Sequence, residues 1–146
     1  MLGSAAACGG DGAGPSPTFE SIAGSYAGTM AGVSQGVALN GTFSLTITQN
    51  GGSATGTWAL QGVLTDGIDL VAVQGTGTLS GTVASGTNPS VNITVRSGFC
   101  PNYQSNFSGA YDSANRRLTV TGAVEFFANN SCTVVLSYPM TMILNR

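Results

Sequence analysis

The chain has 146 residues, of which 42% are hydrophobic and 7% charged, and its net charge is −2. This length suits one domain with a real core, and the charge excludes a basic surface for nucleic acid. No histidine or lysine is present, which excludes Ser-His-Asp triads, imidazole metal ligands, lysine Schiff bases and P-loops. We therefore expect no enzymatic activity, no metal and no cofactor.

The N-terminal segment is rich in small residues and contains one cysteine. The stretch Ala5-Ala6-Ala7-Cys8-Gly9 resembles the lipobox of bacterial lipoproteins, in which a cysteine after small residues is acylated. The glycines and prolines that follow are typical of a flexible tether. The resemblance implies lipidation at Cys8, membrane contact through that anchor only, and location in the bacterial cell envelope or secretion. The alternative is a disordered leader with a free thiol.

We accordingly divide the chain into a shortened signal remnant with its tether, residues 1–18, and a folded domain, residues 19–146. From residue 22 onward apolar and polar side chains alternate with the period of two that a half-buried strand requires. Residues 37–48 show this clearly, and Asn50-Gly51-Gly52 then forms a hairpin turn. Residues 53–62 form the next strand, with Trp58 on its inward row.

Residues 68–83 are long for one strand, and their apolar parity shifts, which predicts a bulge near Leu70 or a break near Gly75. Further inward rows follow at 91–95, 107–111, 118–126 and 134–144. The pattern gives about eight antiparallel strands joined mostly by tight turns, with no helix.

The predicted fold is all-β, a single antiparallel up-and-down barrel of about eight strands. Closure would remove strand edges that the Thr- and Ser-rich outer faces do not protect with charge. The alternative is a two-sheet β-sandwich, which Pro139 favours because proline within a strand usually marks an edge or a bulge.

Counting alternating strand directions brings Cys100 and Cys132 to one end of the domain. A disulfide between them would contribute roughly 3–4 kcal/mol and indicates an oxidising compartment. We call this end the cystine pole; it carries the loops at 34–36, 64–67, 98–103 and 127–131. The opposite pole carries the tether, the loops at 50–52, 84–90 and 112–115, and the C-terminus.

Two short segments, Gly56-Thr57-Trp58 and residues 108–114 (Ser-Gly-Ala-Tyr-Asp-Ser-Ala), resemble strands of avidin and lipocalin barrels. The whole chain is similar to the small Gly- and Thr-rich β-barrel lipoproteins of bacteria. The resemblance implies the barrel architecture. It implies no ligand, because the several tryptophans that line the biotin pocket of avidins have no counterparts beside Trp58.

The leading functional hypothesis is a non-enzymatic envelope lipoprotein that binds a small apolar ligand in or at the mouth of the barrel. Phe99, Tyr103 and Phe127 would form the rim at the cystine pole, with Trp58 deeper. A single tryptophan on an inward row is more often a core residue than a ligand platform, and inward glycines more often bend a small barrel than leave room for a ligand. By parity Glu125 points outward, so we expect no buried charge to fix a polar ligand.

The alternative hypothesis is a structural or interaction module with a filled core, which would bind a protein or glycan through its outer face. A hollow interior would favour the ligand-binding hypothesis, whereas a filled core with self-association or partner capture would favour the module. The identity of the ligand and the oligomeric state do not follow from the residues.

Overall fold

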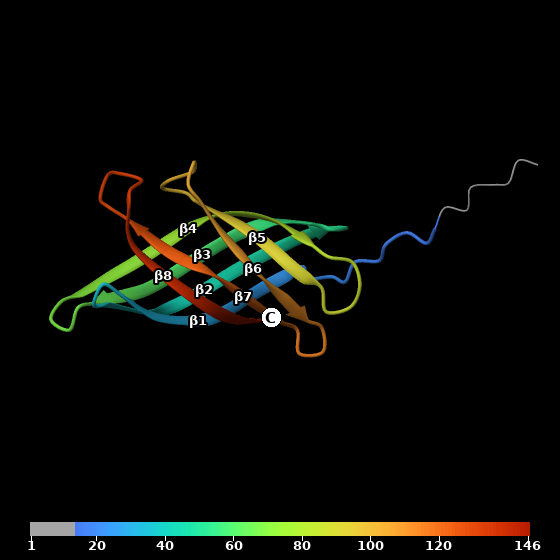
Figure 1. Ribbon diagram of the computed structural model, residues 1–146, viewed down its shortest axis with the longest axis horizontal. Helices are drawn as coiled ribbons and strands as arrows, with labels where there is room; N and C mark the ends of the chain where they lie inside the picture. The colour runs from blue at the N-terminus through green and yellow to red at the C-terminus, as the bar shows by residue number, and fades with distance from the viewer. Residues whose placement is uncertain (1–13) are drawn as a thin grey trace, which may run out of the picture.

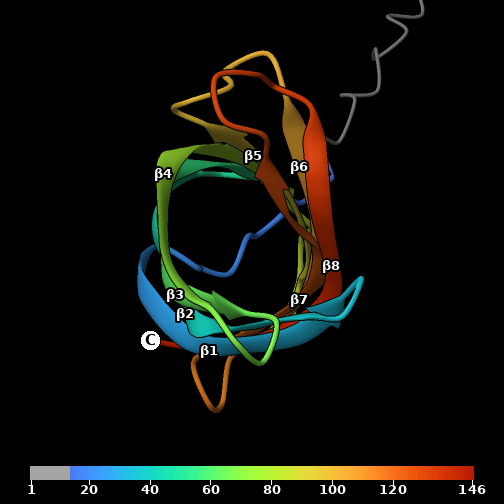
Figure 2. The same cartoon turned by 90° about the vertical axis from the view of Figure 1, so that its left-hand side faces the viewer.

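A computed structural model describes residues 14–146, so Cys8 and the whole lipobox-like stretch lie outside the described residues. The domain is a closed barrel in which eight antiparallel strands follow chain order (Figures 1 and 2). The strands are β1 (Gly24–Ser34), β2 (Val37–Asn50), β3 (Ser53–Thr65), β4 (Leu70–Val83), β5 (Ser90–Ser97), β6 (Gln104–Asp112), β7 (Arg117–Phe127) and β8 (Val134–Asn145). No helix occurs within residues 14–146. The predicted up-and-down barrel is confirmed, and the sandwich alternative is wrong.

Closure joins the first strand to the last, where Ala27 of β1 pairs with Asn145 of β8. Gly28 permits the close approach, because a Cβ atom at that position would lie 2.2 Å from the carbonyl oxygen of Ile143. Pro139 of β8 pairs with Ala123 of β7, and the other edge of β8 meets β1. In the described chain β8 and β1 share few backbone pairs, so β8 tolerates a proline, which cannot donate a backbone hydrogen bond.

The predicted bulge or break in residues 68–83 is wrong. β4 is continuous, and its pairing with β3 runs without a shift from Ser53↔Thr82 to Thr65↔Leu70. The apparent change of parity arises because Ile68 and Leu70 are 90% and 77% exposed. These apolar side chains lie at the rim of the barrel and belong to no inward row.

The half of the barrel near the opposite pole is filled by side chains. Tyr26 and Tyr111 meet edge to face with their ring centroids 6.4 Å apart, and both are buried with Leu118. The incoming chain covers this end: Ile22 is fully buried, and its carbonyl accepts a hydrogen bond of 2.7 Å from the Tyr26 hydroxyl. The Gln49 side-chain oxygen accepts a hydrogen bond of 2.7 Å from the Ile22 amide. This pole is therefore closed.

The cystine pole is more open because the strands there have unequal lengths. β5 ends at Ser97, opposite Gly77 of β4, so β4 extends several residues beyond its neighbour. β6 and β7 pair from Asp112↔Arg117 to Ser108↔Thr121, although β7 continues to residue 127. Figure 2 shows the long loops before β6 and after β7 standing away from the ring of strands. The wall of the barrel is thus incomplete on this side.

The predicted disulfide is confirmed. Cys100 and Cys132 are bonded, with their Cα atoms 5.7 Å apart, and the bond ties the loop before β6 to the loop after β7. Both loops lie at the same end of the molecule as the β1–β2 and β3–β4 turns, as strand counting predicted (Figure 1). The cystine therefore holds together the two loops that border the open part of the wall.

Candidate ligand-binding site

A cavity of about 1010 Å³ lies at the cystine pole, a volume at the upper end of the range of small-molecule sites. Its walls come from β3, β4, the end of β5, the start of β6, the end of β7, one residue of β2 and the loops before β6 and after β7. The strands contribute mainly apolar side chains from their inward rows: Phe43, Trp58, Leu60, Val73, Phe107 and Val124. Core side chains still fill the β1, β2 and β8 side of this pole, where Met30, Leu39 and Tyr138 are buried, so the cavity occupies the side formed by β3 to β7.

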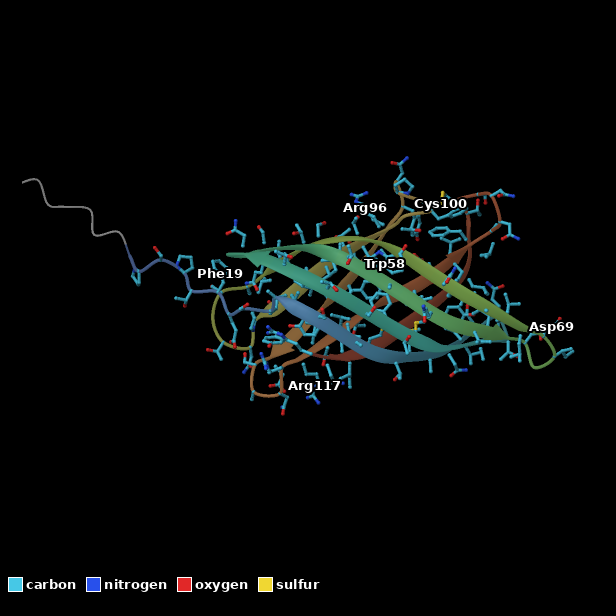
Figure 3. All side chains as sticks on the ribbon, turned by 180° about the vertical axis from the view of Figure 1, so that it is seen from behind. Phe19, Trp58, Asp69, Arg96, Cys100 and Arg117 are labelled. Carbon is cyan, nitrogen blue, oxygen red and sulfur yellow. A yellow bond between two sulfur atoms is a disulfide. The ribbon has the colours of Figure 1, made fainter. Side chains whose placement is uncertain are left out.

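All four aromatic residues that the sequence suggested for a site line this cavity: Trp58, Phe99, Tyr103 and Phe127. Phe99 is 59% exposed and lies at the mouth, while Tyr103 and Phe127 meet edge to face with ring centroids 4.9 Å apart. Trp58 lies further along the barrel, between Cys100 and Phe19, while Asp69 marks the end of the barrel at the cystine pole (Figure 3). Ligand binding by these residues stays a prediction.

The indole of Trp58 is held rigidly in the wall. Its ring stacks on Phe43 with centroids 5.9 Å apart and planes 15° apart, and its Nε1 donates a 2.9 Å hydrogen bond to the carbonyl of Arg96. The neighbouring strand β4 has glycines where the indole ring lies. A Cβ atom at Gly77 would be 2.6 Å from Nε1, and one at Gly75 would be 3.2 Å from Cη2. These two glycines make room for the indole, a role that sequence reasoning missed.

Glu125 was expected to point outward with no role, yet it lines the cavity. The alternation assigned Glu125 to the correct face of β7, because its neighbour Val124 is buried on the inner face. The pairing of β7 with β6 has ended before this point, so the outer face of β7 turns toward the inner face of β6. The Oε2 atom accepts hydrogen bonds from the Tyr103 hydroxyl and, at 2.8 Å, from the Ser105 hydroxyl.

The same carboxylate has further capacity for a ligand. Its second oxygen, Oε1, accepts only a long hydrogen bond of 3.4 Å from the Ser137 hydroxyl within the described chain. The hydrogen bond to Glu125 raises the pKa of Tyr103 to about 12, so the phenol stays neutral and donates its proton to the carboxylate. Among the described lining residues, Glu125 is the one that carries a charge.

Exposed apolar side chains surround the same pole. Ile68, Leu70 and Val71 form one group at the β3–β4 turn, with exposed fractions of 90%, 77% and 54%. The other members are Val33, Val63, Phe99 and Val135. We call these seven residues the apolar rim. Of these seven residues, Val71 and Phe99 also line the cavity. Single exposed apolar residues are ordinary on a protein surface, whereas a group of them at one pole is typical of an interaction surface.

Residues 14–146 contain no group of three His, Cys, Asp or Glu side chains that could hold a metal ion. No helix in this part of the chain is long and apolar enough to cross a bilayer. No family model, no curated protein and no solved structure matched the chain. The segments that resemble avidin and lipocalin strands do lie on barrel strands, Gly56–Trp58 on β3 and most of 108–114 on β6. The architecture that the resemblance implied is therefore present.

Proposed function

We propose that this protein binds a small apolar molecule in the cavity at the cystine pole and catalyses no reaction. The observation that carries the proposal is the cavity at this pole, about 1010 Å³ with mainly apolar walls. A barrel of eight strands either fills its interior with side chains or holds one small ligand. Here side chains fill the opposite pole and part of the cystine pole, the remaining space is the cavity, and the incomplete wall between β4 and β7 would provide an entrance.

The wall is also suited to binding because it is already formed. Trp58 is fixed by stacking, by its hydrogen bond and by the glycines beneath it, so it loses little freedom when a ligand packs against it. The disulfide similarly restrains the two loops at the mouth. Preformed sites bind more tightly because less ordering accompanies association.

The emission of Trp58, the single tryptophan, provides the test. We expect saturable changes when the protein is titrated with decan-1-ol, a neutral ten-carbon probe. Val73 lies in the cavity wall, so Val73→Phe should weaken binding by filling the space. Ile143→Phe is the matched control, because Ile143 is 50% exposed on β8 and lies near the opposite pole, where it pairs with Thr119. Emission that does not change with decanol, or equal binding by the two variants, would overturn the proposal.

We further propose that the protein is anchored in the bacterial envelope through Cys8. The Cys100–Cys132 bond supports an oxidising compartment. Residues 14–23 reach β1 at the opposite pole (Figure 1), so the cavity would face away from the membrane. Mass spectrometry of the membrane fraction tests this: acylation should be present in the natural chain and lost in Cys8→Ser. An unmodified Cys8 in the soluble fraction would contradict it.

A second candidate function, an interaction module, is favoured by the apolar rim. Ile68, Leu70 and Val71 are exposed side by side where β4 extends beyond β5. Sedimentation of the natural chain and of Leu70→Ser separates the candidates. Association that Leu70→Ser abolishes, without decanol binding, would favour the module over the ligand-binding protein.

A further inference from the structure

Glu125 gives the cavity one negative charge that no lining cation balances. The described cavity wall contains no arginine. The guanidinium of Arg96 is directed elsewhere and donates a 3.3 Å hydrogen bond to the carbonyl of Pro101. The salt bridge found in the described chain, Arg117–Asp112 at 3.5 Å, lies at the opposite pole. The cavity is therefore mainly apolar with a localised anionic group.

Building on the proposed function, we propose that the ligand is a cationic amphiphile: an apolar chain or ring system that carries a protonated amine at one end. The amine would bind beside Glu125, and the apolar part would extend toward Trp58 and Phe43. A carboxylate in a partly enclosed, apolar site favours a ligand that neutralises it. The same charge repels fatty acids and other anionic amphiphiles.

The hydrogen bonds around Glu125 leave an acceptor for the amine. Tyr103 and Ser105 both donate to Oε2, while Oε1 receives only the 3.4 Å contact from Ser137. An ammonium group has three hydrogen-bond donors and no acceptor. It therefore fits beside Glu125, because the Tyr103 and Ser105 hydroxyls already donate to Oε2 and Oε1 remains as an acceptor. Two donors on one oxygen also fix the direction of the carboxylate.

Aromatic rings beside the carboxylate add a second attraction. Tyr103 contacts Glu125 directly and packs edge to face against Phe127, which lies two residues further along β7. Ring faces within about 6 Å of a cation attract it through their quadrupole. The stacked pair of Phe43 and Trp58 offers an apolar surface deeper in the barrel. The site thus has a charged end and an apolar end in the order that an amphiphile requires.

Three probes of equal chain length test the inference: decylamine, decan-1-ol and decanoate, each below its critical micelle concentration at pH 7. Trp58 emission and calorimetry report their affinities. We expect decylamine to bind about tenfold more tightly than decanol, the order expected for a partly desolvated charge-assisted contact, and decanoate to bind most weakly. The preference for decylamine should fall as salt is added.

Two variants identify the origin of the preference. Glu125→Gln should lose the preference for decylamine over decanol. Glu20→Gln is the matched control, because it removes a negative charge at the opposite pole, close to Gln49. Should Glu125→Gln not fold, as judged by circular dichroism, the probe ranking and salt dependence of the natural chain decide the question.

The possible results are distinguishable. Equal affinities for decylamine and decanol, or an unchanged preference in Glu125→Gln, would overturn the cationic ligand and leave the apolar binding function standing. If no probe binds, the proposed function itself fails, and the inference fails with it. Tighter binding of decanoate than of decanol would show that Glu125 does not control selection at this site.

Discussion

The disulfide provides the stability prediction that can be worked out most fully. Cys100 and Cys132 are 32 residues apart, and cross-linking an unfolded loop of that length removes roughly 12 cal/mol/K of entropy, or about 3.7 kcal/mol at 25 °C. Replacing both cysteines by alanine also leaves a small void at the fully buried Cys100, which costs roughly 1 kcal/mol. We expect the free energy of unfolding to fall by about 4–5 kcal/mol and Tm to fall by roughly 10–15 °C.

Urea unfolding followed by the emission of Trp58 measures this loss. All variants should also carry Cys8→Ala so that no third thiol exchanges, and the Cys8→Ala chain with its disulfide intact is the control. The denaturant slope m should rise when the bond is removed, because the unfolded chain then exposes more surface. A loss below about 1 kcal/mol with unchanged m would refute the reasoning, since it would show that the bond does not restrict the unfolded chain.

Two further predictions concern the cavity wall. Gly77→Ala should destabilise the fold by about 1–3 kcal/mol and alter Trp58 emission. The reason is that the new Cβ would lie 1.9 Å from the carbonyl oxygen of Arg96. Unfolding curves that match those of the natural chain would contradict this prediction. Ultraviolet titration should show the pKa of Tyr103 near 12 and, in Glu125→Gln, closer to the ordinary value of about 10. The pKa of Tyr103 is higher in the folded than in the unfolded chain, so its contribution to stability is present below pH 10 and is lost as pH rises toward 12. Identical titration curves for the natural chain and Glu125→Gln would argue against the hydrogen bond.

Local features of the sequence determined the strands and their inward rows. Alternation placed Trp58 on the inner face because side chains in a strand change face at every residue. The Asn50-Gly51 turn and its counterparts set the directions of successive strands. With the directions known, Cys100 and Cys132 had to lie at one pole, and the aromatic residues at 99, 103 and 127 had to lie near them.

Only the tertiary structure decided where the wall is incomplete and what lines the cavity. Glu125 has the outward parity that its sequence position gives, yet it lies against the cavity because the pairing of β6 with β7 ends at Ser108↔Thr121. Likewise, Gly77 seats Trp58 only because β3 and β4 bring those two residues opposite each other. The choice of a barrel over a sandwich depended on the meeting of β1 and β8, which are separated by nearly the whole domain. The length over which two strands pair, and the closure of the barrel, depend on strands that are distant in sequence. The alternation of side chains within one strand therefore cannot predict either of them.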